Sequence, residues 1–140
     1  MSKNEPISSI MTSQVVSLTA DNSLHDADRL FSQRKFRHIP VVRGGELAGM
    51  LSLTDLLRLS FADQFSEDGE AAADSAVYNM LTISQVMMAA PITVQEGQTI
   101  EEVARIFTQI EFHALPVLRD KELVGIVTTT DMIRYLLDNL

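Results

Sequence analysis

The sequence contains no cysteine among its 140 residues. Disulfide bonds, thiolate zinc sites and cysteine nucleophiles are therefore excluded together. A chain without cysteine suits a reducing compartment, so we expect a cytoplasmic protein. The histidines number only three and are scattered along the chain, which does not match the ligand spacing of a metal site. We therefore expect no metal site.

Long apolar runs are missing as well. The longest, such as residues 47–51 and 123–127, are far shorter than the roughly 20 residues that a membrane-spanning helix needs. The N-terminal residues MSKNEPISSI lack the apolar stretch of a signal peptide. We expect neither insertion into a membrane nor secretion, and the hydrophobic content of 46% is sufficient for a globular core.

Basic residues are fewer than acidic ones, with 11 Lys and Arg against 19 Asp and Glu, which gives a formal net charge of −8. Nonspecific binding of nucleic acid depends on basic side chains that neutralise phosphates, so this balance argues against a nucleic-acid partner. The charge is unevenly distributed: residues 7–60 carry +1 and residues 83–136 carry −3. Residues 61–82 hold five acids and no base, and we interpret residues 62–82 as an acidic linker.

The sequence also lacks the motifs of common catalytic sites. It has no Gly-rich phosphate-binding loop, no HExxH metal motif and no G-x-S-x-G nucleophile elbow. We therefore expect a protein that is not an enzyme, and we assign no catalytic residue.

What the sequence does contain is an internal repeat. Residues 7–60 align with residues 83–136 at a constant offset of 76 without a gap, and 16 of the 54 aligned pairs are identical. The repeat divides the chain into a first copy (1–61), the linker (62–82) and a second copy (83–140). Identical pairs include Met11 with Met87, Phe31 with Phe107, Pro40 with Pro116, Gly49 with Gly125, and Asp55 with Asp131.

Both copies begin with a short apolar turn, an extended segment and an amphipathic helix. Ser23 and Thr99 are predicted N-caps, and an acid three residues later in each copy completes the pattern of a capping box. Apolar residues at helical spacing give each helix one face to bury, namely Leu24, Ala27, Leu30 and Phe31 in the first copy and Ile100, Val103, Ala104, Phe107 and Ile110 in the second.

Two apolar strands follow the helix in each copy, and a second helix closes the copy. The turns between the strands are predicted at Gly44-Gly45 and Asp120-Lys121, and the closing helices near residues 53–61 and 129–137. The fold class is therefore α+β, with two β-α-β-β-α repeats. A repeat of about 54 residues forms only a small hydrophobic core and would be marginally stable alone, so we expect the repeats to pack as a pseudo-two-fold pair.

The order of elements, the segments RHIPVV and HALPVL, and above all GMLSLTD at 49–55 and GIVTTTD at 125–131 resemble the cystathionine β-synthase (CBS) domain family. The resemblance covers the chain outside its first six residues, the linker and the last few residues. It implies a tandem CBS pair, or Bateman module, which senses AMP, ADP or ATP in clefts between its repeats. Such a module catalyses nothing and requires no cofactor, because the nucleotide is a regulatory ligand.

The resemblance implies a role for the motif G-h-h-S/T-x-x-D, where h is apolar. In the family the hydroxyl lies near the phosphate and the carboxylate contacts the ribose, which implies Ser52 with Asp55 and Thr128 with Asp131. A strand that runs directly into a helix suits an anion, because the helix N-terminus has free N–H groups and a positive dipole end. The same residues are equally explained as N-caps with their third-position partners, and both interpretations remain open.

The start of the second strand carries the charges that differ between the copies. The resemblance implies phosphate contacts from Arg37 and His38. A solvated helix end is the alternative explanation for Arg34, Lys35 and Arg37, and Arg37 is the stronger functional candidate of the three. In the second copy His113 stands at the position of Arg37, and the equivalents of Lys35 and His38 are Glu111 and Ala114. We therefore expect two unequal sites. His113 is open as a phosphate contact or as a packed core residue.

The resemblance also implies that the adenine lies against the first strand. The residues concerned are Thr12, Val16 and Ser17 in the first copy and Ile92 and Thr93 in the second. Ordinary strand packing explains these residues as well. Met88, at the position equivalent to Thr12, breaks the polar match. His25 is expected to be exposed and is assigned no role.

The closing helices carry more apolar side chains than one core should need, which predicts a homodimer. The resemblance implies a disk of four CBS domains and an effector protein that the sequence does not identify. The alternative is a structural or protein-interaction module whose clefts are empty or hold S-adenosylmethionine or a divalent ion. The apolar residues are Leu56, Leu57, Leu59, Met132, Ile133, Tyr135, Leu136 and Leu137.

Overall fold

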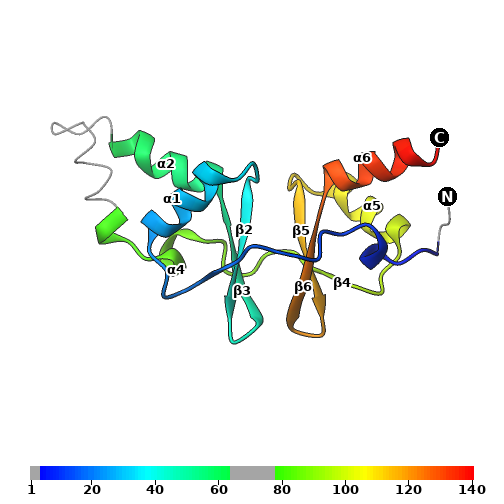
Figure 1. The fold of residues 1–140 in the computed structure, drawn as a ribbon, viewed down its shortest axis with the longest axis horizontal. Coiled ribbons are helices and arrows are strands. Elements are labelled where there is room, and N and C mark those ends of the chain that lie inside the picture. The colour runs from blue at the N-terminus through cyan, green and yellow to red at the C-terminus, as the bar shows by residue number, and fades with distance from the viewer. Residues whose placement is uncertain (1–3, 64–77) are drawn as a thin grey trace. The chain divides into compact units, whose positions relative to one another are not determined.

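The computed structural model of the protein describes residues 4–63 and 78–140, so most of the segment interpreted as a linker lies outside the described residues. The described residues form two compact units (Figure 1). Unit 1 contains residues 4–15, 45–47 and 91–140. Unit 2 contains residues 16–44, 48–63 and 78–90.

Unit 2 holds most of the elements of the first copy. In chain order they are β1 (Leu18–Thr19), α1 (Leu24–Gln33), β2 (His38–Arg43), most of β3 (Glu46–Ser52) and α2 (Leu53–Asp63), followed by α4 (Ile83–Val86). The short β1 runs parallel to β2, with Leu18 opposite Val41. Gly44 and Gly45 connect β2 to β3 and both have positive φ, 59° and 85°, which a residue with a side chain adopts at a cost.

Unit 1 holds the equivalent elements of the second copy. They are β4 (Val94–Gln95), α5 (Ile100–Gln109), β5 (Ala114–Arg119), β6 (Glu122–Thr128) and α6 (Thr129–Asp138), and the unit also contains η1 (Ile7–Ser9) from the first copy. β4 is parallel to β5, and β5 is antiparallel to β6. The two copies therefore have the same order of elements, which confirms the predicted α+β fold with two repeats.

The first helix of each copy begins at the predicted N-cap. The Ser23 hydroxyl accepts a hydrogen bond from the Asp26 N–H (3.1 Å), and the Asp26 carboxylate accepts one from the Ser23 N–H (2.9 Å), so this capping box is closed. Thr99 accepts from the Glu102 N–H (3.1 Å), but the Glu102 carboxylate accepts from the side-chain amide of Gln98 (3.4 Å) instead of closing the box. The predicted second box is therefore only half formed.

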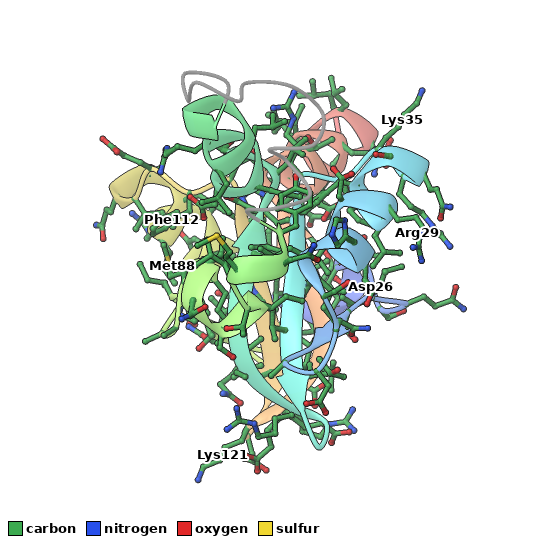
Figure 2. The ribbon with its side chains drawn as sticks, turned by 90° about the vertical axis from the view of Figure 1, so that its left-hand side faces the viewer. Asp26, Arg29, Lys35, Met88, Phe112 and Lys121 are labelled. Atoms are coloured by element: carbon green, nitrogen blue, oxygen red, sulfur yellow. The ribbon has the colours of Figure 1, made fainter. Side chains whose placement is uncertain are left out.

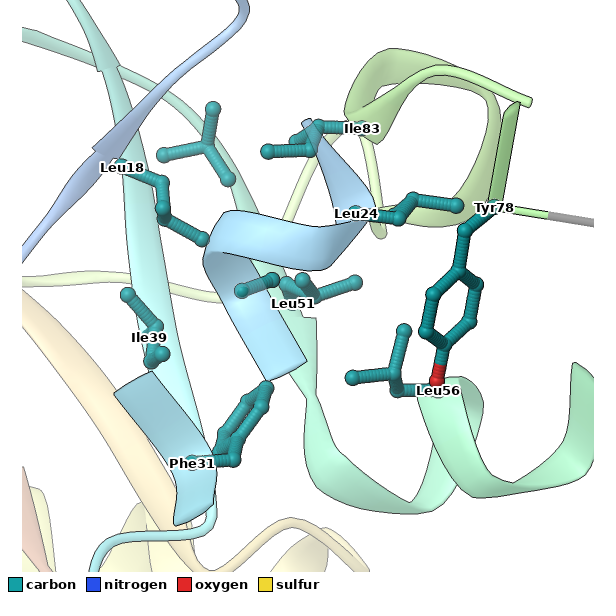
Figure 3. Close-up of a cluster of buried hydrophobic side chains, with 10 residues drawn as sticks. Leu18, Leu24, Phe31, Ile39, Leu51, Leu56, Tyr78 and Ile83 are labelled. Atoms are coloured by element: carbon teal, nitrogen blue, oxygen red, sulfur yellow. The ribbon is translucent and has the colours of Figure 1, made fainter. Parts of the chain in front are cut away.

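The core of each unit includes a residue from the first turn of the other copy. The core of unit 2 is built from apolar residues of β1, α1, β2, β3 and α2, and it also contains Ile83 of α4 (Figure 3). Ile7 of η1 is likewise fully buried in the core of unit 1, against residues of β4, α5, β5 and β6. Each compact unit therefore combines segments of both sequence copies, which the repeat does not predict.

We call residues 7–12 and 83–88 the exchanged segments, because each packs into the unit that holds most of the other copy. A methionine of each exchanged segment packs against a glycine of that unit. A Cβ placed on Gly49 would overlap the Met87 sulfur, and a Cβ on Gly125 would overlap the Met11 sulfur. The residues after these methionines make backbone bridges. Met88 pairs with Met50 in unit 2 (N–O distances of 2.9 and 3.0 Å), and Thr12 pairs with Ile126 in unit 1 (2.9 and 3.0 Å). The repeated glycines are therefore explained by close packing against methionine.

The closing helices bury more apolar residues than the sequence predicted. Leu56 is only 1% exposed, and Leu59, Met132 and Tyr135 pack against the cores because they lie on the inward helical face. Their assignment to a surplus apolar surface is therefore wrong. Among the α2 and α6 side chains whose burial the structure describes, the large apolar residues that remain exposed are Leu57 (56%), Ile133 (57%), Leu136 (47%) and Leu137 (63%).

Two smaller expectations also need correction. Strand pairing in the first extended segments is limited to Leu18–Thr19 and Val94–Gln95, so the residues before them are not part of a strand. His25 is half-buried instead of exposed, because its ring packs edge-on against Tyr78 and its Nε2 lies 3.2 Å from the Asn79 side-chain oxygen. Across 4–63 and 78–140, no helix is both long enough and apolar enough to cross a membrane.

Candidate functional site

The first motif lies where β3 ends and α2 begins in unit 2. The Ser52 hydroxyl accepts a hydrogen bond from the Asp55 N–H (3.0 Å), so Ser52 caps the helix. The Asp55 carboxylate lies 3.4 Å from the Arg58 guanidinium, and 33% of the Asp55 side chain is exposed. The carboxylate is therefore accessible to a ligand while the hydroxyl holds the first turn of the helix.

Arg37 is brought to this motif by a backbone hydrogen bond. The Leu53 N–H donates to the Arg37 carbonyl (2.8 Å), which fixes the start of β2 beside the first residue of α2. The Arg37 side chain is exposed, and the adjacent His38 is half-buried. Arg34 and Lys35 are also exposed. Figure 2 shows Lys35 projecting away from the ribbon. Within residues 4–63 and 78–140, no hydrogen bond or ion pair engages the side chains of Arg34, Lys35 and Arg37.

Val16 and Ser17 lead into β1 at the same end of the strands. The pairing of β1 with β2 starts at Leu18 opposite Val41, so Ser17 immediately precedes the paired residues. Ser17 is exposed and Val16 is half-buried. Six of the sequence-predicted residues therefore gather at one end of β1, β2 and β3. We call them the unit 2 site: Val16, Ser17, Arg37, His38, Ser52 and Asp55.

The second motif lies at the start of α6 in unit 1, and its hydrogen bonding is more complete. The Thr128 hydroxyl accepts from the Asp131 N–H (3.1 Å), and the Asp131 carboxylate accepts from the Thr128 N–H (2.9 Å). The other carboxylate oxygen lies 3.6 Å from the Arg134 guanidinium, and only 11% of the Asp131 side chain is exposed. The capping interpretation therefore accounts for both hydrogen bonds between Thr128 and Asp131.

His113 takes the place of Arg37 in unit 1. Its carbonyl accepts from the Thr129 N–H (3.0 Å), as the Arg37 carbonyl does from Leu53. The His113 side chain is exposed, so the alternative that it is packed in a core is wrong. Neighbouring Glu111 is exposed too, and Ala114 is buried. Before β4, Ile92 is 41% exposed and Thr93 is half-buried.

Thr12 lies with the second motif and not with Val16 and Ser17. Its backbone bridges to Ile126, two residues before Thr128, and its side chain is exposed. Thr12, His113, Thr128 and Asp131 are tied together by these backbone bonds, and Ile92 and Thr93 belong to the same unit. We call these six residues the unit 1 site. In unit 2 the position equivalent to Thr12 is occupied by Met88, which is 40% exposed.

Sequence reasoning missed the part that methionines play beside both motifs. Met87 and Met88 contact the Gly49–Met50 segment of unit 2, and Met11 contacts Gly125 in unit 1. The signal was present in the sequence as the identical pairs Met11 with Met87 and Gly49 with Gly125. In the described ranges, no group of three or more His, Asp or Glu side chains could hold a metal ion.

Two repeats, each joining a strand hairpin to a capped helix with a hydroxyl and a carboxylate in its first turn, define a tandem-domain class of protein. The family model described as the CBS domain matches residues 7–62 and again residues 83–138. The chain therefore belongs to the CBS domain family and carries two CBS domains in tandem.

Several relatives support this assignment. The chain is 28% identical over 134 residues to protein MJ1225 of Methanocaldococcus jannaschii, covering 95% of this chain and 48% of the relative. It matches the solved CBS-pair protein CBSX2 of Arabidopsis thaliana with a TM-score of 0.82 and 25% identity, covering 97% of this chain and 96% of that one. It matches the CBS domain pair of protein MJ0100 with a TM-score of 0.76 and 21% identity, covering 96% and 98%, respectively, which shows the fold.

Two of the solved relatives have been determined with bound ligands. CBSX2 has been solved in complex with AMP. The MJ0100 domain pair has been solved with 5′-methylthioadenosine and S-adenosyl-L-methionine. The chain spans half or less of the length of the first curated relatives that it matches.

Proposed function

We propose that this chain is a regulatory module that binds an adenine nucleotide, AMP, ADP or ATP, and has no catalytic activity of its own. The observation that carries the proposal is the hydrogen bond from the Leu53 N–H to the Arg37 carbonyl. It brings a basic side chain to the N-terminus of α2, where Ser52 and Asp55 already lie. A phosphate, a ribose and a base then each have a complementary group in the unit 2 site.

The chemistry of each group fits one part of a nucleotide. The N-terminus of α2 and the Arg37 guanidinium suit a phosphate, because the positive end of the helix dipole and a cation both attract an anion there. The partly exposed Asp55 carboxylate can accept hydrogen bonds from the ribose hydroxyls, and Ser17 and Val16 line the end of β1. A charge-assisted hydrogen bond contributes about 1.5–3 kcal/mol. Two or three such bonds with base burial could supply the roughly −7 kcal/mol of a ten-micromolar site.

The module is also proposed to act through other proteins. The exposed apolar side chains on α2 and α6, Leu57, Ile133 and Leu137 among them, suit a homodimer. A change in this pairing on nucleotide binding would be read by an effector protein in the cytoplasm. No cofactor, nucleic acid or membrane enters the proposal.

A second candidate function is a structural or protein-interaction module. The observation that favours it is the closed capping box of Thr128 and Asp131, which explains the motif without any ligand. In that case the sites would be empty or would hold S-adenosylmethionine or a divalent ion. The two candidates differ in whether an adenine nucleotide stabilises the folded protein.

Thermal melting of nucleotide-stripped protein separates the two functions. The ligands are AMP, ADP, ATP, NADH and S-adenosylmethionine, each with and without magnesium. A ligand at 100 times its Kd adds about 2.7 kcal/mol to the stability of the fold. For a chain of 140 residues this corresponds to a rise in Tm of about 9 °C.

Asp55→Ala should abolish this rise, and Asp28→Ala, which removes an exposed acid from α1, should preserve it. No rise with AMP, ADP or ATP would refute nucleotide sensing. A rise with S-adenosylmethionine alone would favour the second function.

A further inference from the structure

We propose that the two motifs have divided their roles: the unit 2 site binds the phosphate-bearing nucleotide, and the unit 1 motif serves mainly as a helix cap. The chain would then bind one nucleotide tightly, and any second nucleotide at least about tenfold more weakly. This inference rests on the function proposed above, which it refines by assigning the ligand to one set of residues.

The first observation is the different state of the two carboxylates. Asp55 and Asp131 each lie near an arginine one turn later, at 3.4 Å and 3.6 Å, so that contact does not distinguish them. Asp131 additionally accepts from the Thr128 N–H, and 11% of its side chain is exposed against 33% for Asp55. Within the described residues, no corresponding bond joins the Asp55 carboxylate to the Ser52 N–H. A ribose therefore reaches Asp55 more easily.

The cost of using Asp131 follows from its hydrogen bonds. A carboxylate has lone pairs for several donors, but Oδ2 of Asp131 accepts from the Thr128 N–H, Oδ1 lies 3.6 Å from the Arg134 guanidinium, and little of the group reaches solvent. To accept two ribose hydroxyls with both oxygens, it would have to share Oδ2 between two donors or give up the Thr128 N–H bond. Loss of that bond would open the capping box and leave the N–H of the N-cap residue without its partner. Asp55 has no such bond to lose.

The second observation is the charge around each motif. Arg34, Lys35 and Arg37 are exposed near the unit 2 site and have no ion-pair partner within 4–63 and 78–140. The equivalent positions in unit 1 are Ile110, Glu111 and His113. Three cations have therefore been replaced by an apolar residue, an acid and a histidine. A phosphate is attracted at the first position and opposed by Glu111 at the second.

An NMR titration with AMP tests the division of roles, because a chain of 15.5 kDa gives resolved backbone amide signals. The amides of Ser52 to Asp55 should shift at low AMP concentration. Those of Thr128 to Asp131 should shift only at concentrations at least about tenfold higher. Equal shifts of both sets at the same concentration would overturn the inference and leave the proposed function intact. If neither set shifts with AMP, ADP or ATP, both this inference and the proposed function are refuted.

Matched variants of the two aspartates provide a second test, in which calorimetry measures AMP binding and thermal melting measures stability. Asp55→Asn should weaken AMP binding at least tenfold with little change in Tm. Asp131→Ala should lower Tm by about 3 °C, as loss of a helix cap does, while AMP binding changes less than about twofold. Loss of AMP binding in folded Asp131→Ala protein would overturn the inference.

Substitutions at exposed positions seldom prevent folding, so Arg37 and His113 provide a further test. Arg37→Gln should weaken AMP binding at least tenfold and adenosine binding less than about threefold, because only AMP carries the phosphate. His113→Gln should leave both affinities within about twofold. Equal losses of AMP and adenosine binding in Arg37→Gln would refute the phosphate role, as would a loss in His113→Gln as large as that in Arg37→Gln.

Discussion

Replacing Gly49 and Gly125 by alanine tests the contacts that tie each exchanged segment to its unit. Neither glycine has a positive φ, so alanine meets no conformational barrier at either position. Alanine also reduces the freedom of the unfolded chain, which favours folding by about 0.4–1 kcal/mol. The outcome at each position therefore depends on what the new methyl group meets.

The two glycines differ in what surrounds them. At Gly125 the three atoms nearest to the new methyl group are the sulfur, Cγ and Cε of the Met11 side chain, which can move. At Gly49 it would meet the Met87 side chain and also the Met88 carbonyl oxygen at 2.7 Å. That carbonyl is held by the Met50 N–H (3.0 Å) in a two-bond bridge and moves only if the bridge distorts. The Gly49 contact is therefore the stiffer one.

We expect Gly125→Ala to change the free energy of unfolding by less than about 1 kcal/mol, because side-chain movement and the entropic gain nearly cancel. Gly49→Ala should cost about 2 kcal/mol through overpacking and a strained bridge. The corresponding loss of Tm is about 7 °C for a chain of 140 residues.

Urea denaturation and calorimetry of the variants measure these costs. The added changes Met87→Ala and Met11→Ala complete a double-mutant cycle at each site. The first should recover only part of the loss in Gly49→Ala, because the carbonyl contact remains. Equal costs at the two glycines, or no coupling between each glycine and its methionine, would refute the packing argument.

Two further predictions concern acid stability and self-association. Hydrogen bonds from the Ser23 N–H and Asn22 hold the pKa of Asp26 below its usual range. Asp26 thus stabilises the fold above the pH where it titrates in the unfolded chain, and this contribution is lost as pH falls through the lowered pKa. When melting is measured from pH 7 to pH 2, Tm should fall less steeply with falling pH in Asp26→Asn than in the unchanged protein. An equally steep fall would contradict the stabilising role of the Asp26 carboxylate. Ile133→Glu combined with Leu137→Glu should convert a dimer to monomer in light scattering after size exclusion. Asp138→Lys on the same helix should not, and a dimer that survives the double change would rule out α6 as its interface.

The sequence predicts the elements well because their signals are local. The helix starts at Ser23 and Thr99, the glycine turn at 44–45 and the paired apolar strands each follow from neighbouring residues, and each appears where expected. The identity of Leu56 as a core residue was also encoded, since it continues the inward face of its helix. Counting apolar residues without their helical phase assigned it to the surface.

The exchange of first turns could not be predicted from the repeat. Ile7 and Ile83 are identical, as are Met11 and Met87, so either segment suits either core. Which core receives each segment is decided by chain connectivity and not by residue type. For the same reason Thr12 could not be assigned to the second motif in advance, because its backbone bridge to Ile126 depends on that exchange.

The residues that shape the fold and the residues that we propose to contact a ligand have changed to different degrees between the copies. Thr54-Asp55 and Thr130-Asp131 are identical, as are the glycines packed against methionine, because the first turn of a helix and a tight strand contact tolerate few substitutions. At positions 34, 35, 37 and 38, where side chains do not hold the first turn of a helix, no residue is shared with positions 110, 111, 113 and 114. A motif that also caps a helix is therefore poor evidence of binding by itself. The charge beside it carries the information about the ligand.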